Sequence, residues 1–294
     1  MNRKGLFVIF LFLWSAPVPA DALQTAFFEK LVPLHEIKKS PGPSDWLATH
    51  PESGQTFAQY EASRPAVPDE KRKFIYVVLL GDFDKTRREI IEMTARYVEI
   101  YFHVPVKFAP ELPLSLIPGD ARRVHPTTGD RQILTRAVIE QILKPRMPED
   151  AFCLIAFTSS DLWPGEGWNF VFGEASMEDR LGVWSIYRNG DPGKSRDDFQ
   201  LCLKRTIKTG THEIGHMFGL DHCIYYECNM NGSNHRQEYD ARPLWLCPVC
   251  LRKIVGALNL DPVTWYQHLA QIRGEYEFEA ERQFFERCLS ILRQ

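Results

Sequence analysis

The sequence lacks the features that mark several large classes of protein. Lysine plus arginine number 35 and aspartate plus glutamate 38, so the formal net charge of −3 leaves no basic excess for nucleic acid and no acidic tail. The chain has no internal repeat, no low-complexity tract, no glycine-rich phosphate loop and no sequence motif of a serine or cysteine nucleophile. These absences argue against repeat proteins, nucleotide-binding enzymes, nucleophile-dependent hydrolases and a nucleic-acid partner.

Long hydrophobic runs are also missing, apart from one short run near the N-terminus. An apolar run at residues 5–14 follows Arg3 and Lys4, and small residues suited to cleavage occur at 18–22. The run is too short to span a bilayer comfortably. It predicts a cleaved signal peptide at residues 1–22, export to the periplasm or the medium, and no stable membrane insertion afterwards. An uncleaved N-terminal membrane anchor is the alternative.

The most informative stretch runs from Thr211 to His222 and has the pattern H-E-x-x-H-x-x-G-x-x-H. On a helix, His212 and His216 project from one face about a turn apart, which suits two imidazoles on one zinc ion. Gly219 permits a left-handed turn that brings His222 back as a third ligand. Three protein ligands leave a position for water, the arrangement of catalytic zinc. Glu213 is placed to act on that zinc-bound water as general base.

Four cysteines follow the histidine motif in two close pairs, namely Cys223, Cys228, Cys247 and Cys250. Two such pairs usually make a closed tetrahedral zinc site. Export favours two disulfides instead, because oxidising compartments preserve them. We favour a second, structural zinc ion, because zinc bound during folding protects thiolates. Cys153, Cys202 and Cys288 are expected to be buried thiols, with a disulfide after export as the alternative.

A methionine lies between the two cysteine pairs, in a turn rich in asparagine and glycine. Met230 in this position resembles the Met-turn of metzincins, which places an apolar thioether beneath the catalytic zinc. The whole combination, closed by Cys-Pro-x-Cys, resembles the archaemetzincins. The resemblance covers roughly residues 40–292. Further matching segments are Ser44–Trp46, His50–Glu52, Pro148–Cys153, Trp168–Gly173, Gly232–His235 and Arg242–Leu244.

The resemblance implies a function and assigns residues to it. In archaemetzincins three histidines bind catalytic zinc, a glutamate is the base and four cysteines bind a second zinc, and each position is filled here. Some metzincins are kept inactive by a prosegment cysteine, but none precedes Cys153 in this chain. His235 follows the Met-turn and is a candidate substrate contact, with a structural hydrogen bond as the alternative. Tyr239 is a candidate for stabilising the oxyanion.

The chain order predicts the fold. Residues 1–22 are the signal peptide, 23–73 an N-terminal extension with linker, and 74–294 a metzincin-like catalytic domain with an upper subdomain at 74–219 and a lower one at 220–294. Alternating elements predict a twisted, mostly parallel α/β (α+β) sheet with packed helices. Predicted strands are 74–80, 104–108, 151–157, 169–172 and 182–187, and predicted helices are 84–102, 131–143, 201–218, 251–258, 263–272 and 278–292.

One predicted strand carries a functional expectation. Metzincins hold an extended substrate against an antiparallel edge strand, so Asn169, Phe170, Val171 and Phe172 are predicted to bind substrate. An ordinary core strand is the alternative for these residues. Residues 161–165 are predicted to form a loop near the cleft.

We therefore predict a zinc metallopeptidase that holds two zinc ions, one catalytic and one structural. Its partner is a peptide or protein substrate, and an aminopeptidase is one option among peptidases. The alternative function is a zinc-dependent peptide-binding protein with little hydrolysis. The oligomeric state is not encoded in any pattern, and a monomer is the default.

Overall fold

The structure is a computed structural model that describes residues 27–272 and 276–294. The signal peptide predicted at residues 1–22 lies outside the described residues, and its export function stays a prediction. Among the helices of the described ranges, none combines the length and the apolar character that a bilayer crossing requires.

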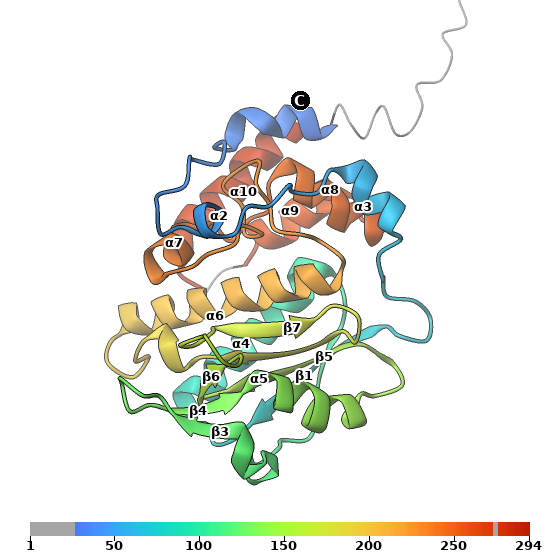
Figure 1. Ribbon diagram of the computed structural model, residues 1–294. Helices are drawn as coiled ribbons and strands as arrows, with labels where there is room; N and C mark the ends of the chain where they lie inside the picture. Colours follow the sequence, from blue (N-terminus) through green and yellow to red (C-terminus); the bar gives the residue numbers. More distant parts are fainter. Residues whose placement is uncertain (1–26, 273–275) are drawn as a thin grey trace, which may run out of the picture.

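A central sheet of five strands has the order β2-β1-β5-β8-β7 (Figure 1). Its strands are β1 Phe74–Leu80, β2 Val106–Phe108, β5 Ala151–Thr158, β7 Gly173–Ser176 and β8 Leu181–Ser185. Four of them are parallel, while β7 pairs antiparallel with β8 at the edge. The predicted fold class, a mostly parallel sheet with an antiparallel edge strand, is confirmed.

Alternate side chains of β1 are buried in the cores on the two opposite faces of the sheet. Val77 and Leu79 join the core beneath α4 (Lys85–Phe102) and α6 (Arg196–Met217). Val78 and Leu80 point to the opposite face and join the core around residues 135–143. Because successive strand residues point to opposite faces, a continuous apolar strand is what a sheet covered on both sides requires. Figure 1 shows α4 and α6 on one side of the sheet and α5 on the other.

A second sheet of three strands corrects two predictions. It contains β3 Arg122–Val124, β4 Arg131–Leu134 and β6 Asp161–Trp163. Residues 131–143 are therefore not one helix, because α5 (Thr135–Ala137) and a π-helical turn (Val138–Leu143) begin only after β4. Residues 161–163 are a strand rather than a loop. The Gln132 amide donates to Asp161 Oδ2 (2.7 Å) and the Asn169 carbonyl (2.9 Å), contacts that periodicity does not reveal.

The edge strand was predicted four residues too early. Asn169, Phe170, Val171 and Phe172 form an irregular segment with a single bridge from Val171 to Leu162, and β7 starts only at Gly173. The alternating aromatic residues suggested a strand. Their rings instead lie against guanidinium groups, Phe170 under Arg188 (3.9 Å) and Phe172 under Arg236 (4.2 Å). These contacts hold the segment together with two backbone hydrogen bonds, from Val171 to Leu162 (3.1 Å) and from Ser185 to Phe172 (2.9 Å).

The active-site helix α6 starts five residues before the predicted Leu201. The side chain of Ser195 accepts a hydrogen bond from the backbone N–H of Asp198, which caps the helix at Arg196. Residues 196–200, which precede the predicted start, therefore form the first turn of the helix. The longer helix crosses the molecule between the sheet and the C-terminal helices (Figure 1).

In the described residues before 74 and after 219, the regular elements are helices. The predicted C-terminal helices are confirmed as α8 Pro248–Ala257, α9 Pro262–Ala270 and α10 Glu279–Leu292, and α7 is Arg236–Ala241. The N-terminal elements are η1 Val32–Leu34, α2 Trp46–Thr49 and α3 Phe57–Ser63. They lie beside the C-terminal helices rather than beside the sheet (Figure 1). Short 3₁₀ turns are η2 Leu114–Leu116, η3 Gly119–Ala121, η5 Lys144–Arg146 and η6 Tyr187–Asn189.

Candidate metal centre

The structure brings the three motif histidines together. His212 and His216 lie on one face of α6, and their Nε2 atoms are 3.1 Å apart. His222 joins them from the following turn, so that one ring nitrogen from each of the three lies within 4.8 Å of the others. The turn is the one expected, because Gly219 has a φ of +82°. A side chain there would also meet Pro65, whose Cβ lies 2.7 Å from the position of an added Cβ.

A hydrogen bond to Nδ1 fixes each imidazole. His212 Nδ1 lies 2.8 Å from the carbonyl oxygen of Asn229, and His216 Nδ1 lies 2.6 Å from that of Leu220. A carbonyl oxygen can only accept, so His216 carries its proton on Nδ1 and keeps a lone pair on Nε2. The same tautomer of His212 satisfies the shorter of its two Nδ1 contacts, since Arg242 Nη1 lies 3.0 Å from that atom. Burial lowers the pKa of His212 well below its usual range and that of His216 to about 3, so both rings are neutral.

This arrangement fits a bound cation. Two Nε2 lone pairs facing each other at 3.1 Å repel, and a cation shared with His222 removes that repulsion. Imidazole is a ligand that zinc prefers, and three protein ligands leave a coordination position for water. The donor set therefore suits catalytic rather than closed structural coordination.

Glu213 lies beside this cluster in the wall of a cleft of about 390 Å³. Burial raises the pKa of its carboxyl to about 7, although His222 and Arg242 counteract the rise. A carboxyl group with a pKa near neutrality can accept and release a proton during one reaction cycle. His212 and His222 also line this cleft, so Glu213 and two of the histidines face the same space.

The predicted substrate residues fall into two groups. Asn169, Phe170, Val171 and Phe172 all line the cleft, although they form an irregular segment. His235 does not line it, and we correct that expectation. Its Nε2 lies 2.8 Å from Asp45 Oδ1, and its Nδ1 accepts from the backbone of Glu238 as the cap of α7. The histidine is used in the fold, which is the structural alternative.

The hydroxyl of Tyr239 is also used in the fold. It lies 2.8 Å from Thr209 Oγ1 and donates to the carbonyl of Arg205, both on α6. Its ring lines the cleft, but its hydroxyl is engaged with the helix. Tyr239 is therefore placed as a wall of the cleft rather than as a free hydrogen-bond donor.

Met230 lies beneath the histidines, where the Met-turn resemblance places it. Its side chain is fully buried, and a Cβ added to Gly215 would lie 2.6 Å from its sulfur. The glycine between the first two histidines thus permits the close approach of helix and turn. Asn231 holds the turn by accepting from the Cys228 N–H (2.8 Å) and donating to the carbonyl of Cys223 (2.7 Å). Sequence reasoning identified the methionine but not the matching glycine.

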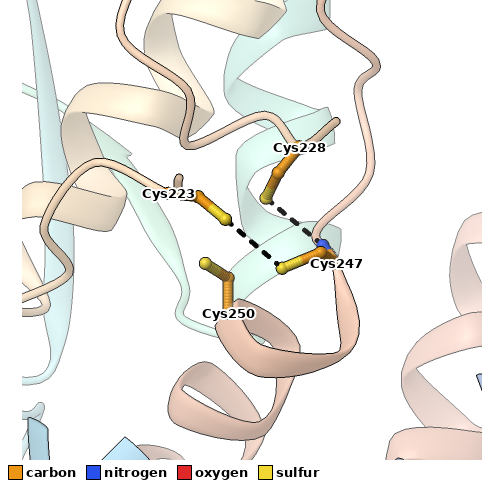
Figure 2. Close-up of side chains that lie close together, drawn as sticks. All are labelled: Cys223, Cys228, Cys247 and Cys250. Atoms are coloured by element: carbon orange, nitrogen blue, oxygen red, sulfur yellow. Dashed lines mark hydrogen bonds between the residues drawn. The ribbon is translucent and has the colours of Figure 1, made fainter. Parts of the chain in front are cut away.

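The four cysteines form a second cluster (Figure 2). Their sulfur atoms lie within 4.8 Å of one another, all four side chains are buried, and all are free thiols. Cys247 and Cys250 sit at the start of α8, while Cys223 and Cys228 come from the loop after α6. Burial raises the pKa of Cys247, and four thiolates can share such a space only around a cation. The geometry favours the zinc interpretation over two disulfides. Cys153, Cys202 and Cys288 are also free and buried, as expected.

Two residues near the histidines had no role assigned from the sequence. Glu52 lies 2.8 Å from His222 Nδ1 through its Oε1 atom. Arg242 is 4% exposed, donates to the Asn231 carbonyl (2.7 Å) and lines the cleft near Glu213. Both belong to segments that resembled the archaemetzincins, but no spacing rule links them to the histidines, because they are brought close only by the fold.

Comparisons with known proteins agree with this site. The model of peptidase family M54 matches residues 73–255. Archaemetzincin-2 of Pongo abelii is 38% identical over 261 residues, covering 78% of this chain and 72% of that protein. Archaemetzincin of Thermococcus kodakarensis is 34% identical, covering 63% of this chain and 98% of that protein. The crystal structure of archaemetzincin from Methanopyrus kandleri superposes with a TM-score of 0.51 at 27% identity, covering 66% of this chain and 99% of that one.

Proposed function

The chain belongs to peptidase family M54, the archaemetzincins, and is a zinc metallopeptidase; on this premise we propose which residues carry the reaction. His212, His216 and His222 hold the catalytic zinc ion through their Nε2 atoms. The observation that carries this assignment is the convergence of one ring nitrogen from each histidine, with partners at Nδ1 of all three rings that leave Nε2 available. Bound zinc lowers the pKa of water toward 7 and polarises the scissile carbonyl.

Glu213 is the general base in this proposal. Its carboxylate takes a proton from the attacking water and later gives that proton to the leaving amine. Two features of the chain support the role. Glu213 faces the cleft next to His212, and its burial raises the pKa of the carboxyl to about 7, so that the group is ready both to accept and to donate.

A second zinc ion is proposed for Cys223, Cys228, Cys247 and Cys250. Four thiol ligands complete a tetrahedral shell and leave no position for water, so this ion is structural. It links the loop after α6 to the start of α8, and the loop carries Met230. The structural ion therefore holds the floor of the catalytic site in place.

The substrate is proposed to lie extended along the edge of the central sheet. Strand β7 is the last strand in the sheet order within the described residues, and Gly173 at its start lines the cleft. A peptide in the cleft can extend the sheet through main-chain hydrogen bonds to this edge. Phe170, Phe172 and Tyr239 then form apolar walls for its side chains.

An aminopeptidase is the form of activity we propose to test first. A second hollow shares His222 with the cleft and is lined by Glu52 and Asp221. Carboxylates at the end of a substrate path suit the free amine of a peptide. Cut positions decide the matter, because trimming removes single residues from the N-terminus while an endopeptidase cuts within the chain.

The decisive experiment compares the zinc-loaded protein with its Glu213→Ala variant on a mixed peptide library, with products read by mass spectrometry. We expect the variant to keep its zinc and to lose hydrolysis by at least about 100-fold, the usual contribution of a general base. Glu178→Ala, an exposed substitution in the turn after β7, is the matched control and should retain activity. Undiminished turnover in Glu213→Ala contradicts the assignment of the base. No cleavage by the zinc-loaded wild-type protein favours the alternative, a zinc-dependent peptide-binding protein.

Export is proposed from the N-terminal sequence alone. The charged start, the apolar run at residues 5–14 and the small residues at 18–22 support it. The mass of the protein recovered after expression in a secreting host tests the proposal. A mature chain starting near residue 23 agrees with cleavage, whereas a full-length chain in the membrane fraction supports an N-terminal anchor.

A further inference from the structure

The segment from residue 44 to residue 56, here called the N-terminal strap, reaches the metal centre from outside the region that matches the family model. We infer that the strap completes the catalytic metal site, with Glu52 as a positioning residue for His222. The inference rests on the proposed function, because it takes the three histidines as the ligands of the catalytic zinc. It adds a residue, and a segment of chain, on which metal affinity depends.

The three histidines are not held in the same way. The Nδ1 of His216 contacts the Leu220 carbonyl, and that of His212 contacts the Asn229 carbonyl and Arg242 Nη1 (3.0 Å), all from residues that follow α6. The Nδ1 partner of His222 is instead the carboxylate of Glu52, at 2.8 Å. The chain that follows residue 73 thus contributes the Nδ1 partners of two histidines from its own residues, while the Nδ1 partner of His222 comes from the strap.

The carboxylate of Glu52 is itself held in position. Its Oε1 accepts from the indole Nε1 of Trp46 (2.9 Å) as well as from His222. The Trp46 ring also meets the His222 ring edge-on, with the ring centroids 5.1 Å apart. A partner that can only accept forces the His222 proton onto Nδ1 and leaves Nε2 free for the metal, and the negative charge makes the ring a stronger donor.

The other carboxylate oxygen gives a second reason. Glu52 Oε2 is buried and has no hydrogen-bond partner in the described part of the chain. A buried carboxylate oxygen without a donor costs free energy unless positive charge lies close by. An imidazole that donates its Nε2 lone pair to a cation supplies such charge. The strap therefore places a negative group where the charge that His222 gains on binding a cation compensates it.

The N-terminal side of the strap is locked to the loop that carries the Met-turn. The backbone N–H of Trp46 donates to Glu238 (3.0 Å), and the amide of Asn234 donates to the Ser44 carbonyl (3.2 Å). Gly232 lies directly beneath the indole, since an added Cβ would be 2.3 Å from Trp46 Cδ1. The indole thus sits on a surface that only glycine leaves open.

The C-terminal side of the strap is locked to the turn that precedes His222. The Gln55 amide donates to the Gly219 carbonyl (3.1 Å), and the ammonium of Lys253 donates to Gln55 Oε1 (2.8 Å). Gly219 is the turn residue that directs the chain toward His222. Both ends of the strap are therefore hydrogen-bonded to segments on either side of His222. These contacts hold Glu52 next to His222 as a fixed part of the fold.

The test measures zinc retention by the full-length, zinc-loaded protein in competition with a chelator. Glu52→Ala is expected to weaken one of the two zinc sites about 10- to 100-fold, the usual effect of losing such a partner, while the other site is unchanged. Glu52→Gln keeps an acceptor oxygen but not the charge, so its loss should be smaller than that of Glu52→Ala. Glu61→Ala removes an exposed carboxylate from the neighbouring helix α3 and should bind both ions like the wild type.

Thermal unfolding of the metal-free proteins separates positioning from a purely structural role. The inference expects weaker zinc binding with a similar unfolding temperature, and Glu52→Gln, equal in volume, provides this comparison if the alanine variant folds poorly. Two results overturn it: wild-type zinc affinity in both Glu52 variants, or affinity that falls only in parallel with stability. His222→Ala distinguishes the failures. If it loses an ion while the Glu52 variants do not, the proposed ligands stand and only the role of Glu52 is refuted; if it keeps both ions, the ligand assignment itself is wrong.

Discussion

Replacing Lys253 with methionine tests how the segment around Gln55 is attached to helix α8. Lys253 lies on α8 and is 1% exposed. Its ammonium donates to the backbone carbonyl of Gln55 (2.6 Å) and to the side-chain oxygen of the same residue (2.8 Å). Lys253→Met keeps the aliphatic stem in the core and removes both donors, so two acceptors of Gln55 lose a charged partner.

The expected loss follows from these two hydrogen bonds. Each bond to a charged donor contributes about 1.5 to 3 kcal/mol, and part of that is returned because an ammonium no longer has to be buried. We expect the free energy of unfolding to fall by about 2 to 4 kcal/mol. The Gln55→Ala variant removes the side-chain acceptor of Lys253 together with the amide that donates to Gly219, and it leaves the backbone carbonyl in place. A double-mutant cycle between positions 55 and 253 subtracts the Gly219 contribution and should give a coupling of about 1 to 2 kcal/mol.

The assay is urea unfolding at a fixed free zinc concentration, followed by tryptophan fluorescence and by circular dichroism. Coincident transitions from the two probes are required before the free energies are compared. Lys71→Met, at an exposed lysine in the stretch before β1, is the control and should change stability by less than about 0.5 kcal/mol. A loss no larger than that in Lys253→Met would refute the reasoning, since the ammonium would then contribute nothing net to holding the segment.

Three further predictions concern pH, packing and metal content. Burial lowers the pKa of His35 to about 4, so between pH 6.5 and 4 the unfolded ring binds a proton that the folded ring does not. The stability of the wild-type protein should therefore fall as the pH falls through that window, by about 2 kcal/mol at pH 5. Thermal melts at pH 5 and 7 should show no such dependence for His35→Leu. Gly232→Ala forces a Cβ to 2.3 Å from Trp46 and should cost about 1 to 3 kcal/mol; a Trp46→Ala background should remove most of that penalty, and an unchanged penalty would contradict the contact. Cys250→Ser should carry one zinc ion fewer by elemental analysis and melt at a lower temperature, and normal zinc content would argue against a thiolate site.

Local patterns were sufficient wherever one element buries a regular face. The continuous apolar run at residues 74–80 predicted β1 with its observed bounds, because a strand covered on both sides leaves no polar position. The C-terminal helices were predicted within a few residues, because each buries one apolar face that recurs at helical spacing. Periodicity misled at residues 131–134, which form a strand because Gln132 bonds to Asp161 and Asn169, nearly thirty positions or more along the chain.

The spacing of residues along a helix fixes where their side chains point, so the sequence was sufficient to predict that the motif histidines lie together. Positions 212 and 216 share a face on any α-helix, and Gly219 permits the turn toward His222, so these ligands follow from rules that act over a few residues. The cysteine quartet follows similarly from two close pairs, and the resemblance to archaemetzincins came from the same residues.

Only the tertiary structure decided which other groups surround the histidines. Glu52 lies 170 positions before His222, and nothing in the spacing of the two residues links them. The strap reaches the third ligand because Gly232 leaves room for Trp46 and because Lys253 and Gly219 hold Gln55. Contacts between distant segments depend on how whole elements pack, and packing is a property of the complete chain. The sequence by itself thus determined the proposed ligands, and the tertiary structure decided what orients them.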